Sequence, residues 1–177
     1  MSKVKTDLKR ITASALFAAF ICVASVFVVP VGAIPLTLSN FAVMLCAFTL
    51  STSGVLASVS VYLLLGLCSV PVFSFFQGGP QILFGITGGF LWGYIPLALF
   101  FSLAKRFKNK KLKFFLFVII GMFCMYTLGV VQYCIVSKAN FLSAILVCVL
   151  PFVAFDIIKC VAAYFLSLRL QKIVNRK

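Results

Sequence analysis

The chain has 177 residues, of which 64% are hydrophobic and only 10% are charged, and its formal net charge at pH 7 is +14. Soluble globular domains are about 45–50% apolar and about 25% charged, so this composition excludes an ordinary water-soluble fold. A domain of this size leaves much of its surface facing its surroundings, and here most of that surface must be apolar. The composition therefore predicts an integral membrane protein.

The sequence predicts a single all-α membrane domain, residues 1–177, with about six apolar helices. No Asp, Glu, Lys or Arg occurs between Ile11 and Ala104. A membrane-spanning helix needs about 20 apolar residues, so this segment accommodates roughly four spans and Phe114–Leu168 about two more. Prolines and small polar clusters mark the turns. The predicted spans are residues 11–29, 37–50, 55–70, 82–104, 114–136 and 145–168.

The basic residues predict how these helices are oriented. Positively charged segments are retained on the cytoplasmic side of a membrane. Four spans followed by two place every basic cluster on that side, so both termini are predicted to be cytoplasmic, in a multi-pass protein of the cell membrane. Clusters at helix ends argue against a nucleic-acid-binding surface. The clusters are Lys3, Lys5, Lys9 and Arg10; Lys105, Arg106, Lys108, Lys110, Lys111 and Lys113; and Arg169, Lys172, Arg176 and Lys177.

The titratable residues exclude most enzymatic chemistry. The chain has no histidine, and Asp7 and Asp156 are its only acids. Paired-carboxylate catalysis, a histidine-based triad and a histidine or carboxylate metal site therefore cannot be built. No GxxxxGK[ST] loop is present for ATP. The seven cysteines lie in apolar stretches without a CxxC pair and are expected to pack as small apolar side chains. The sequence thus predicts neither an enzyme nor a metal or cofactor site.

Asp156 and Lys159 are the leading candidates for a binding site. They lie three residues apart on the last predicted helix, and therefore on one face of it. A charge within the membrane costs about 2.5–3.5 kcal/mol on insertion scales, so such residues usually line a cavity or pair with each other. One interpretation is a structural ion pair. The other is a site for a ligand with a hydrogen-bond-donating head, accepted by Asp156, and an anionic tail, bound by Lys159.

A second group of candidates lies in the outer turns. Gly79 and Gln81 belong to the segment Gly78–Gln81, and a polar amide at the outer end of the fourth span could reach an uncharged polar head group. Thr37 and Asn40, with Ser39 between them, form a similar polar patch at the start of the second element. The nearby glycines of Gly85–Gly89 permit either close helix packing or close approach to a ligand. Gln132 is a further polar residue in a span, to which the sequence assigns no role.

Ala15 and Ala19 on the first helix form a strip of small residues. This A-x-x-x-A spacing makes a flat surface on which another helix can lie close. The sequence therefore predicts a partner interface on this helix.

Several of these motifs together resemble the BioY family, the biotin-specific substrate-binding (S) components of energy-coupling-factor transporters. The resemblance extends from about Ile11 to Leu168. The segments that carry it are Pro35–Leu38, Tyr62–Leu67 leading to Val70–Phe73, Gly85–Leu91, which is similar to G-P-T-G-G-[YF]-L, and Pro151–Lys159, which is similar to P-F-x-x-x-D-x-x-K.

The resemblance implies high-affinity capture of biotin at an outward-facing pocket. It implies that Asp156 and Gln81 bind the ureido ring and that Lys159 binds the valerate carboxylate. Uptake then requires a transmembrane coupling subunit, which would contact the strip of Ala15 and Ala19, and two cytoplasmic ATPase subunits. The alternatives are an S component for a related acid such as lipoate, a stand-alone secondary transporter, and a structural membrane protein. Lipoate lacks the ureido N–H groups, so Asp156 favours biotin.

Overall fold

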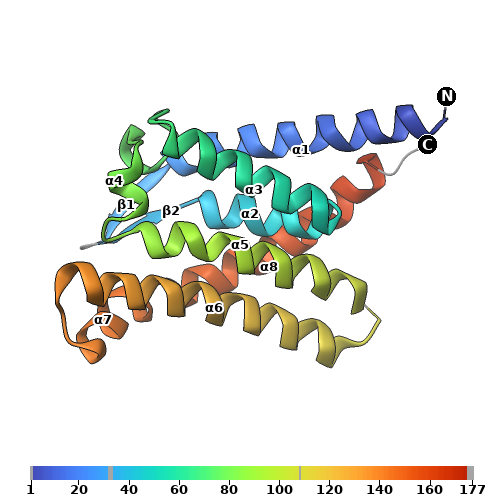
Figure 1. The fold of residues 1–177 in the computed structure, drawn as a ribbon. Coiled ribbons are helices and arrows are strands. Elements are labelled where there is room, and N and C mark those ends of the chain that lie inside the picture. The colour runs from blue at the N-terminus through green and yellow to red at the C-terminus, as the bar shows by residue number, and fades with distance from the viewer. Residues whose placement is uncertain (1, 32–33, 108, 175–177) are drawn as a thin grey trace.

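The computed structural model describes residues 2–31, 34–107 and 109–174. The long helices run along one common axis (Figure 1), and the fold is all-α as predicted, apart from one short two-stranded ribbon. The elements are α1 (Ser2–Val26), β1 (Val28–Val31), β2 (Ile34–Thr37), α2 (Ser39–Thr49), α3 (Thr52–Leu67), α4 (Pro80–Leu83), α5 (Gly88–Ala104), α6 (Lys111–Ser137), α7 (Phe141–Cys148) and α8 (Leu150–Val174), with 3₁₀ turns at Ser74–Phe76 and Lys105–Phe107.

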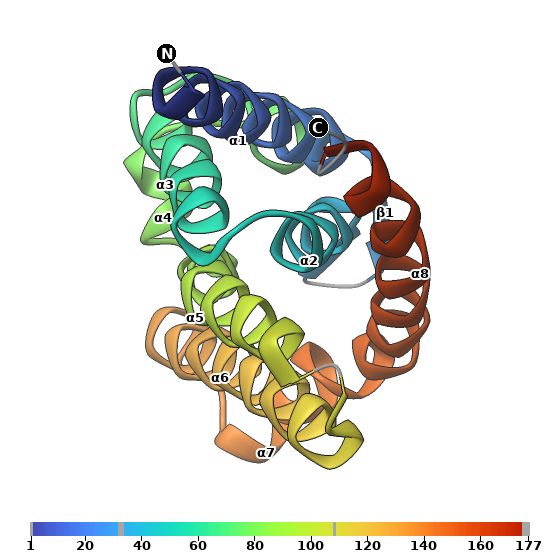
Figure 2. The same cartoon turned by 90° about the vertical axis from the view of Figure 1, so that its right-hand side faces the viewer.

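Helix α2 forms the centre of the molecule. In a view along the common axis, α1, α3, α5 and α8 surround it (Figure 2). Every residue of α2 except Phe41 is buried. A helix that is apolar on all sides is stable when it is enclosed by protein, which agrees with this position. The consequence for the site is that Ser39 and Asn40, at the start of α2, lie inside the bundle.

The outer helices carry the membrane-facing surface. Four helical segments among the described residues are long and apolar enough to cross a membrane, while α2 and α3 are shorter apolar helices. Large apolar side chains such as Ile119 and Phe123 on α6 are more than 60% exposed, as expected for contact with lipid. The crossing of six segments stays a prediction. The four segments are Leu8–Val26, Gly88–Phe107, Lys111–Ser137 and Phe141–Gln171.

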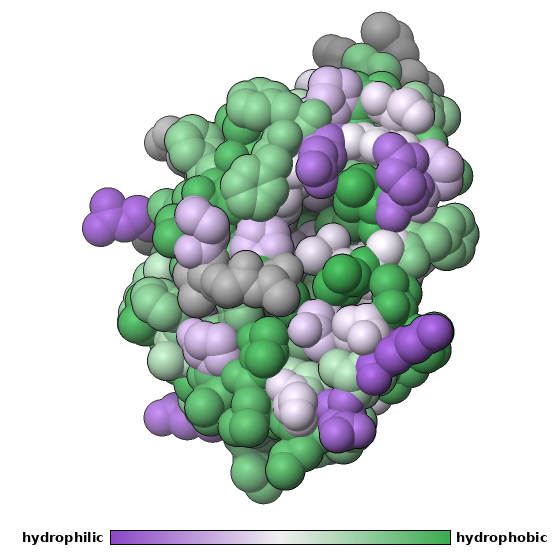
Figure 3. Space-filling model, turned by 90° about the vertical axis from the view of Figure 1, so that its left-hand side faces the viewer, coloured by the Kyte–Doolittle hydropathy of each residue, from purple (hydrophilic) through white to green (hydrophobic). Residues whose placement is uncertain are grey.

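The two ends of the bundle differ in charge. The start of α1, the end of α8 and the connection between α5 and α6 lie at one end (Figure 1), so the fold brings together those members of the basic clusters that the structure describes. At the opposite end, which carries the ribbon and α4, hydrophilic side chains are scattered among apolar ones (Figure 3). The orientation in which this basic end faces the cytoplasm stays a prediction.

The ribbon β1–β2 was not predicted. Helix α1 ends at Val26 instead of Val29, and β1 pairs antiparallel with β2, with Pro30 opposite Pro35. The β-branched residues before Pro30 favour extended backbone, and the residue before a proline disfavours the helical conformation. A two-stranded ribbon tolerates prolines because each strand has a free edge. Strand β2 leads directly into α2 and forms one wall of the cavity described below.

Two predicted spans are interrupted in the structure. The predicted helix 82–104 is split into α4 and α5 by residues 84–87, within the glycine-rich segment. The predicted helix 145–168 is split at Val149 into α7 and α8, because Pro151 cannot supply a backbone N–H to the preceding turn and fits instead at the start of a helix. The predicted start of the third span at Val55 is too late, since Ser51 caps α3 through the N–H of Gly54 at 3.3 Å.

Candidate functional site

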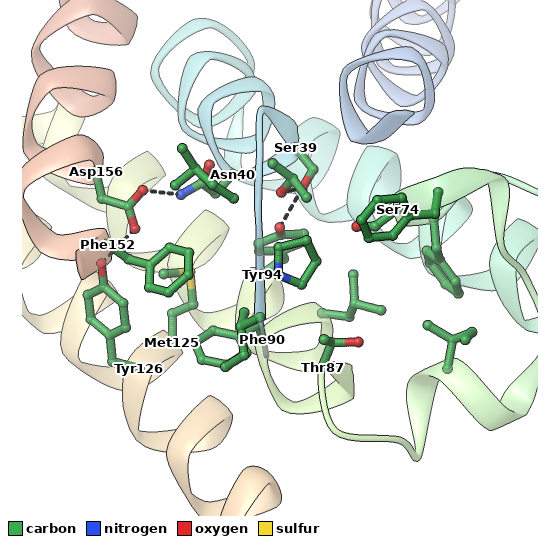
Figure 4. A pocket seen from close by; sticks show the side chains of 18 of the residues that line it. Ser39, Asn40, Ser74, Thr87, Phe90, Tyr94, Met125, Tyr126, Phe152 and Asp156 are labelled. Atoms are coloured by element: carbon green, nitrogen blue, oxygen red, sulfur yellow. Dashed lines mark hydrogen bonds between the residues drawn. The ribbon is translucent and has the colours of Figure 1, made fainter. Parts of the chain in front are cut away.

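A cavity of about 290 Å³ lies between α8, α6, α5, the start of α2 and strand β2. The cavity lies at the end of the bundle that carries the ribbon β1–β2. Figure 4 shows side chains from these elements converging on it. The lining residues are Ile34, Pro35, Leu36, Thr37, Ser39, Asn40, Phe73, Ser74, Phe75, Gln77, Ile82, Thr87, Phe90, Leu91, Tyr94, Met125, Tyr126, Phe152, Asp156 and Lys159.

Asp156 and Lys159 form an ion pair in the wall of this cavity. Lys159 Nζ lies 3.3 Å from Asp156 Oδ1, and Asp156 is 2% exposed. The i,i+3 spacing on α8 brings both side chains to one face, as predicted from the sequence. Lys159 Nζ also donates to the carbonyl oxygen of Thr37 at 2.8 Å and to Asn40 Oδ1 at 3.0 Å. The cation is therefore anchored to the end of β2 and the start of α2.

The carboxylate of Asp156 is held on both oxygens. Asn40 Nδ2 donates to Oδ1 at 2.6 Å, and the hydroxyl of Tyr126 donates to Oδ2 at 2.6 Å. A buried charge is stable when it is paired and its remaining hydrogen-bonding positions are filled, and this arrangement meets both conditions. Asp156 thus connects three helices, α2, α6 and α8, at one side of the cavity (Figure 4).

A chain of hydroxyl groups extends the polar wall from β2 to α5. Thr37 Oγ1 and Ser39 Oγ lie 2.6 Å apart, and Ser39 Oγ lies 2.6 Å from the hydroxyl of Tyr94. Each hydroxyl can donate one hydrogen bond and accept others, so the chain can change its direction of donation when a ligand binds. The remaining lining between these polar groups is largely aromatic and aliphatic, and Phe152, Met125 and Phe90 extend from the side of Asp156 toward Thr87 (Figure 4).

The polar groups at the other side of the cavity are neutral. Ser74, Gln77 and Thr87 line it there, and Figure 4 places Ser74 and Asp156 on opposite sides. Gln77 is exposed and Ser74 and Thr87 are half-buried, in contrast to Asp156. The cavity therefore has a buried, charge-neutralised side at α8 and a more exposed side with neutral hydrogen-bonding groups.

Four of the candidates from the sequence come together in the cavity, and two do not. Thr37, Asn40, Asp156 and Lys159 all line it, whereas Gly79 and Gln81 are not among its lining residues. Gln81 is exposed, and its Nε2 donates to the carbonyl oxygen of Gly78 at 2.7 Å. Gly79 is buried and adopts a φ of 103° as the residue before α4, a conformation that favours glycine.

Sequence reasoning missed Gln77, Tyr94 and Tyr126. The two tyrosines carried a usable signal, since a hydroxyl within an apolar helix requires a partner, and a polar cavity can supply one. Gln77 had no such signal, because its direction depends on the turn before it, where Phe75 has a φ of 59°. Ala15 and Ala19 are exposed on α1, while Ala18 between them is buried. The small-residue strip therefore lies on the outer surface.

Comparisons with known proteins agree with this architecture. The sequence model described as the BioY family matches residues 1–176. The biotin transporter BioY of Thermotoga maritima is 35% identical over 171 residues, covering 94% of this chain and 98% of that protein. The biotin transporter BioY2 of Lactococcus lactis is 32% identical, covering 96% and 94%. A crystal structure of the S-component for biotin from an ECF-type ABC transporter superposes with a TM-score of 0.80 at 20% identity, covering 98% of this chain and 94% of that one, which shows the fold.

Proposed function

Because the chain belongs to the BioY family, we propose that it captures biotin in the cavity beside α8 and serves as the S component of an energy-coupling-factor transporter in the cell membrane. It is a transport component and not an enzyme. The observation that carries the proposal is the ion pair of Asp156 and Lys159 in the wall of a largely apolar cavity. Biotin has a polar ureido group, an apolar bicyclic body and a carboxylate, and this cavity offers complementary surfaces to each.

The contact between Asp156 and Lys159 bears on the orientation of the ligand. Biotin carries its ureido group and its carboxylate at opposite ends, and a pair of charges 3.3 Å apart faces only one of these ends. The ureido group both donates and accepts hydrogen bonds, so it can donate N–H to Asp156 and accept from Lys159. It is uncharged and leaves the pair neutral. A carboxylate there would add a second buried anion beside a single cation, which is costly.

We therefore assign the ureido group to the ion pair and the carboxylate to the more exposed side of the cavity. Ser74, Gln77 and Thr87 can donate hydrogen bonds to it there, and water can solvate it. The aromatic residues Phe90 and Phe152 would contact the bicyclic body. This assignment differs from the expectation based on resemblance, in which Lys159 binds the valerate carboxylate and Gln81 binds the ureido ring. Lys159 now faces the ureido group, and Gln81 has no contact with the ligand because it does not line the cavity.

Uptake requires partners that this chain does not supply. We propose that the exposed strip of Ala15 and Ala19 on α1 contacts a transmembrane coupling subunit. Two cytoplasmic ATPase subunits would supply the energy. The relatives described as biotin transporters and the S-component fold support this arrangement over the alternatives of lipoate capture, stand-alone secondary transport and a purely structural role.

Titration calorimetry of the purified chain in detergent tests the proposal. We expect biotin to bind with at least about a hundredfold higher affinity than lipoate, because lipoate leaves the buried Asp156 without ligand N–H groups. Lys159→Met should abolish measurable biotin binding, while Lys110→Met, at the far end of the molecule, should not alter it. A folded protein that binds neither biotin nor lipoate, or that binds both equally, would contradict the assignment of biotin.

A further inference from the structure

Residues 84–87 interrupt the helical backbone between α4 and α5, next to the cavity. Within a membrane, a break of this kind leaves carbonyl groups without helical partners, and each must be satisfied by other groups. The carbonyls of Leu83 and Gly85 lie at this break, and that of Gly85 also accepts the backbone N–H of Gly88 at 3.2 Å. The segment ends in Thr87, which lines the cavity, and the first turns of α5 supply Phe90 and Leu91 to the same wall.

The side chain of Gln132 on α6 donates to both carbonyls. Its Nε2 donates to the carbonyl oxygen of Leu83 at 2.9 Å and to that of Gly85 at 2.8 Å. A glutamine amide carries two N–H donors, which matches the two acceptors. The indole Nε1 of Trp92 also donates to the Leu83 carbonyl, at 3.2 Å. Gln132 is thus the side chain that connects α6 to the break.

The glycines of α5 allow this reach. A Cβ atom at Gly88 would collide with the Leu83 carbonyl, and one at Gly89 would collide with the backbone of Leu128 on α6. The absence of side chains here lets α6 approach closely enough for Gln132 to reach the break. The glycines therefore serve helix packing at this point, which was one of the two interpretations left open by the sequence.

We propose that Gln132 is a positioning residue for the ligand cavity. Its amide holds the irregular segment 84–87 against α6. This segment sets the direction of Thr87 and Phe90, and α6 supplies Met125 and Tyr126 to the same cavity. It does not line the cavity itself and acts through the backbone of Leu83 and Gly85. The effect on biotin affinity rests on the proposed function, whereas the fastening of the break does not.

Trp92 provides an internal reporter, because it is the only tryptophan of the chain and its indole shares an acceptor with Gln132. The test variant is Gln132→Met, which keeps an unbranched side chain of similar length and removes both donors. We expect a shift of the Trp92 emission maximum in the ligand-free protein. We expect biotin affinity measured by calorimetry to fall by about tenfold, the scale set by losing a hydrogen bond to a buried group.

The matched control is Thr127→Val on the same helix, whose hydroxyl donates only to the Phe123 carbonyl of its own helix among the described residues. It should leave both readouts unchanged. If the Gln132→Met protein has the wild-type emission spectrum and wild-type affinity, the proposal is overturned. A shifted spectrum with unchanged affinity also overturns it, because the amide would then hold the break without shaping the cavity.

Two further outcomes remain decisive. If wild-type protein binds no biotin, the proposed function fails. The claim that Gln132 holds residues 84–87 in place is still tested in that case, because an unshifted Trp92 spectrum in Gln132→Met would contradict it. If Gln132→Met does not fold, Gln132→Asn takes its place, since it keeps the amide on a side chain too short to reach both carbonyls. That variant should show a shifted Trp92 spectrum and weaker biotin binding, and wild-type values for both would overturn the proposal.

Discussion

The side-chain amide of Asn40 donates to the carboxylate of Asp156 across 2.6 Å, although 116 positions separate the two residues in the sequence. This hydrogen bond joins the central helix α2 to the peripheral helix α8. The same Asn40 accepts from Lys159 through its Oδ1 at 3.0 Å, so one amide satisfies both members of the ion pair. The site is therefore organised by a residue that is itself uncharged.

Asn40→Ala is predicted to weaken both stability and biotin binding. The variant leaves Asp156 and Lys159 each without one hydrogen-bond partner in a buried setting, at a cost of about 1–3 kcal/mol. We expect a lower thermal unfolding midpoint in detergent and a larger Kd for biotin by calorimetry. Asn140→Ala, at an exposed position without a side-chain cap, is the control and should behave as wild type. Full biotin affinity in Asn40→Ala would argue against a role for this residue in the site.

Biotin methyl ester distinguishes the two orientations of the ligand. If the carboxylate lies on the exposed side near Gln77, it contacts only neutral groups and is partly solvated. The methyl ester should then bind wild-type protein no more than about tenfold more weakly than biotin does. If the carboxylate instead pairs with the half-buried Lys159, the ester should lose far more. Calorimetry with biotin and its ester measures this difference directly, and a loss of several hundredfold would refute the orientation proposed above.

Gln77→Ala should affect the same end of the ligand. In the proposed orientation, the substitution removes a hydrogen-bond donor to the carboxylate. The affinity for biotin should therefore fall relative to wild type, and the affinity for the methyl ester should fall by a smaller factor. Gln81→Ala is the matched control, because its amide bonds to Gly78 in the same turn and does not line the cavity. Should Gln81→Ala impair binding while Gln77→Ala does not, the assignment of these two residues is wrong.

Ala19→Leu should spare ligand binding and weaken assembly. Ala15 and Ala19 are exposed on α1, so a larger side chain there does not disturb the bundle but prevents close approach of another helix. The measurement is co-purification with a coupling subunit, together with biotin calorimetry on the isolated chain. Ala162→Leu, an exposed alanine on α8, is the control. Undiminished assembly of both Ala15→Leu and Ala19→Leu would rule out this strip as the interface.

The opposite end of α2 should matter for stability and not for affinity. Gln171 Nε2 donates to the carbonyl of Phe48 at 2.5 Å, and Lys105 Nζ donates to the carbonyl of Leu50. These side chains satisfy carbonyls at the helix C-terminus that have no helical partner. Gln171→Leu is expected to destabilise the protein by about 1–3 kcal/mol, seen as a lower unfolding midpoint, with an unchanged Kd for biotin. Lys111→Gln, at an exposed position of the same end, is its control.

The sequence alone determined the class of the protein and identified the ion pair that lies in the wall of the candidate site. The uncharged run from Ile11 to Ala104 requires helices in a membrane, because no soluble fold of this length can bury it. The spacing of Asp156 and Lys159 places them on one helical face whatever surrounds that helix. Both inferences depend on composition or local geometry, and neither needs knowledge of which segments meet.

The tertiary structure decided which groups contact that pair and which side chains of the irregular turns line the cavity. Asn40 and Tyr126 reach Asp156 from two other helices, and no local pattern specifies such contacts, because they depend on how the helices pack. Gln77 lines the cavity and Gln81 does not, since side-chain direction in an irregular turn follows backbone angles such as the φ of 59° at Phe75. Sequence spacing determines the direction of side chains only where the backbone is regular. The other residues of this site lie where helices pack against each other or where the backbone is irregular, so their directions follow from the tertiary structure.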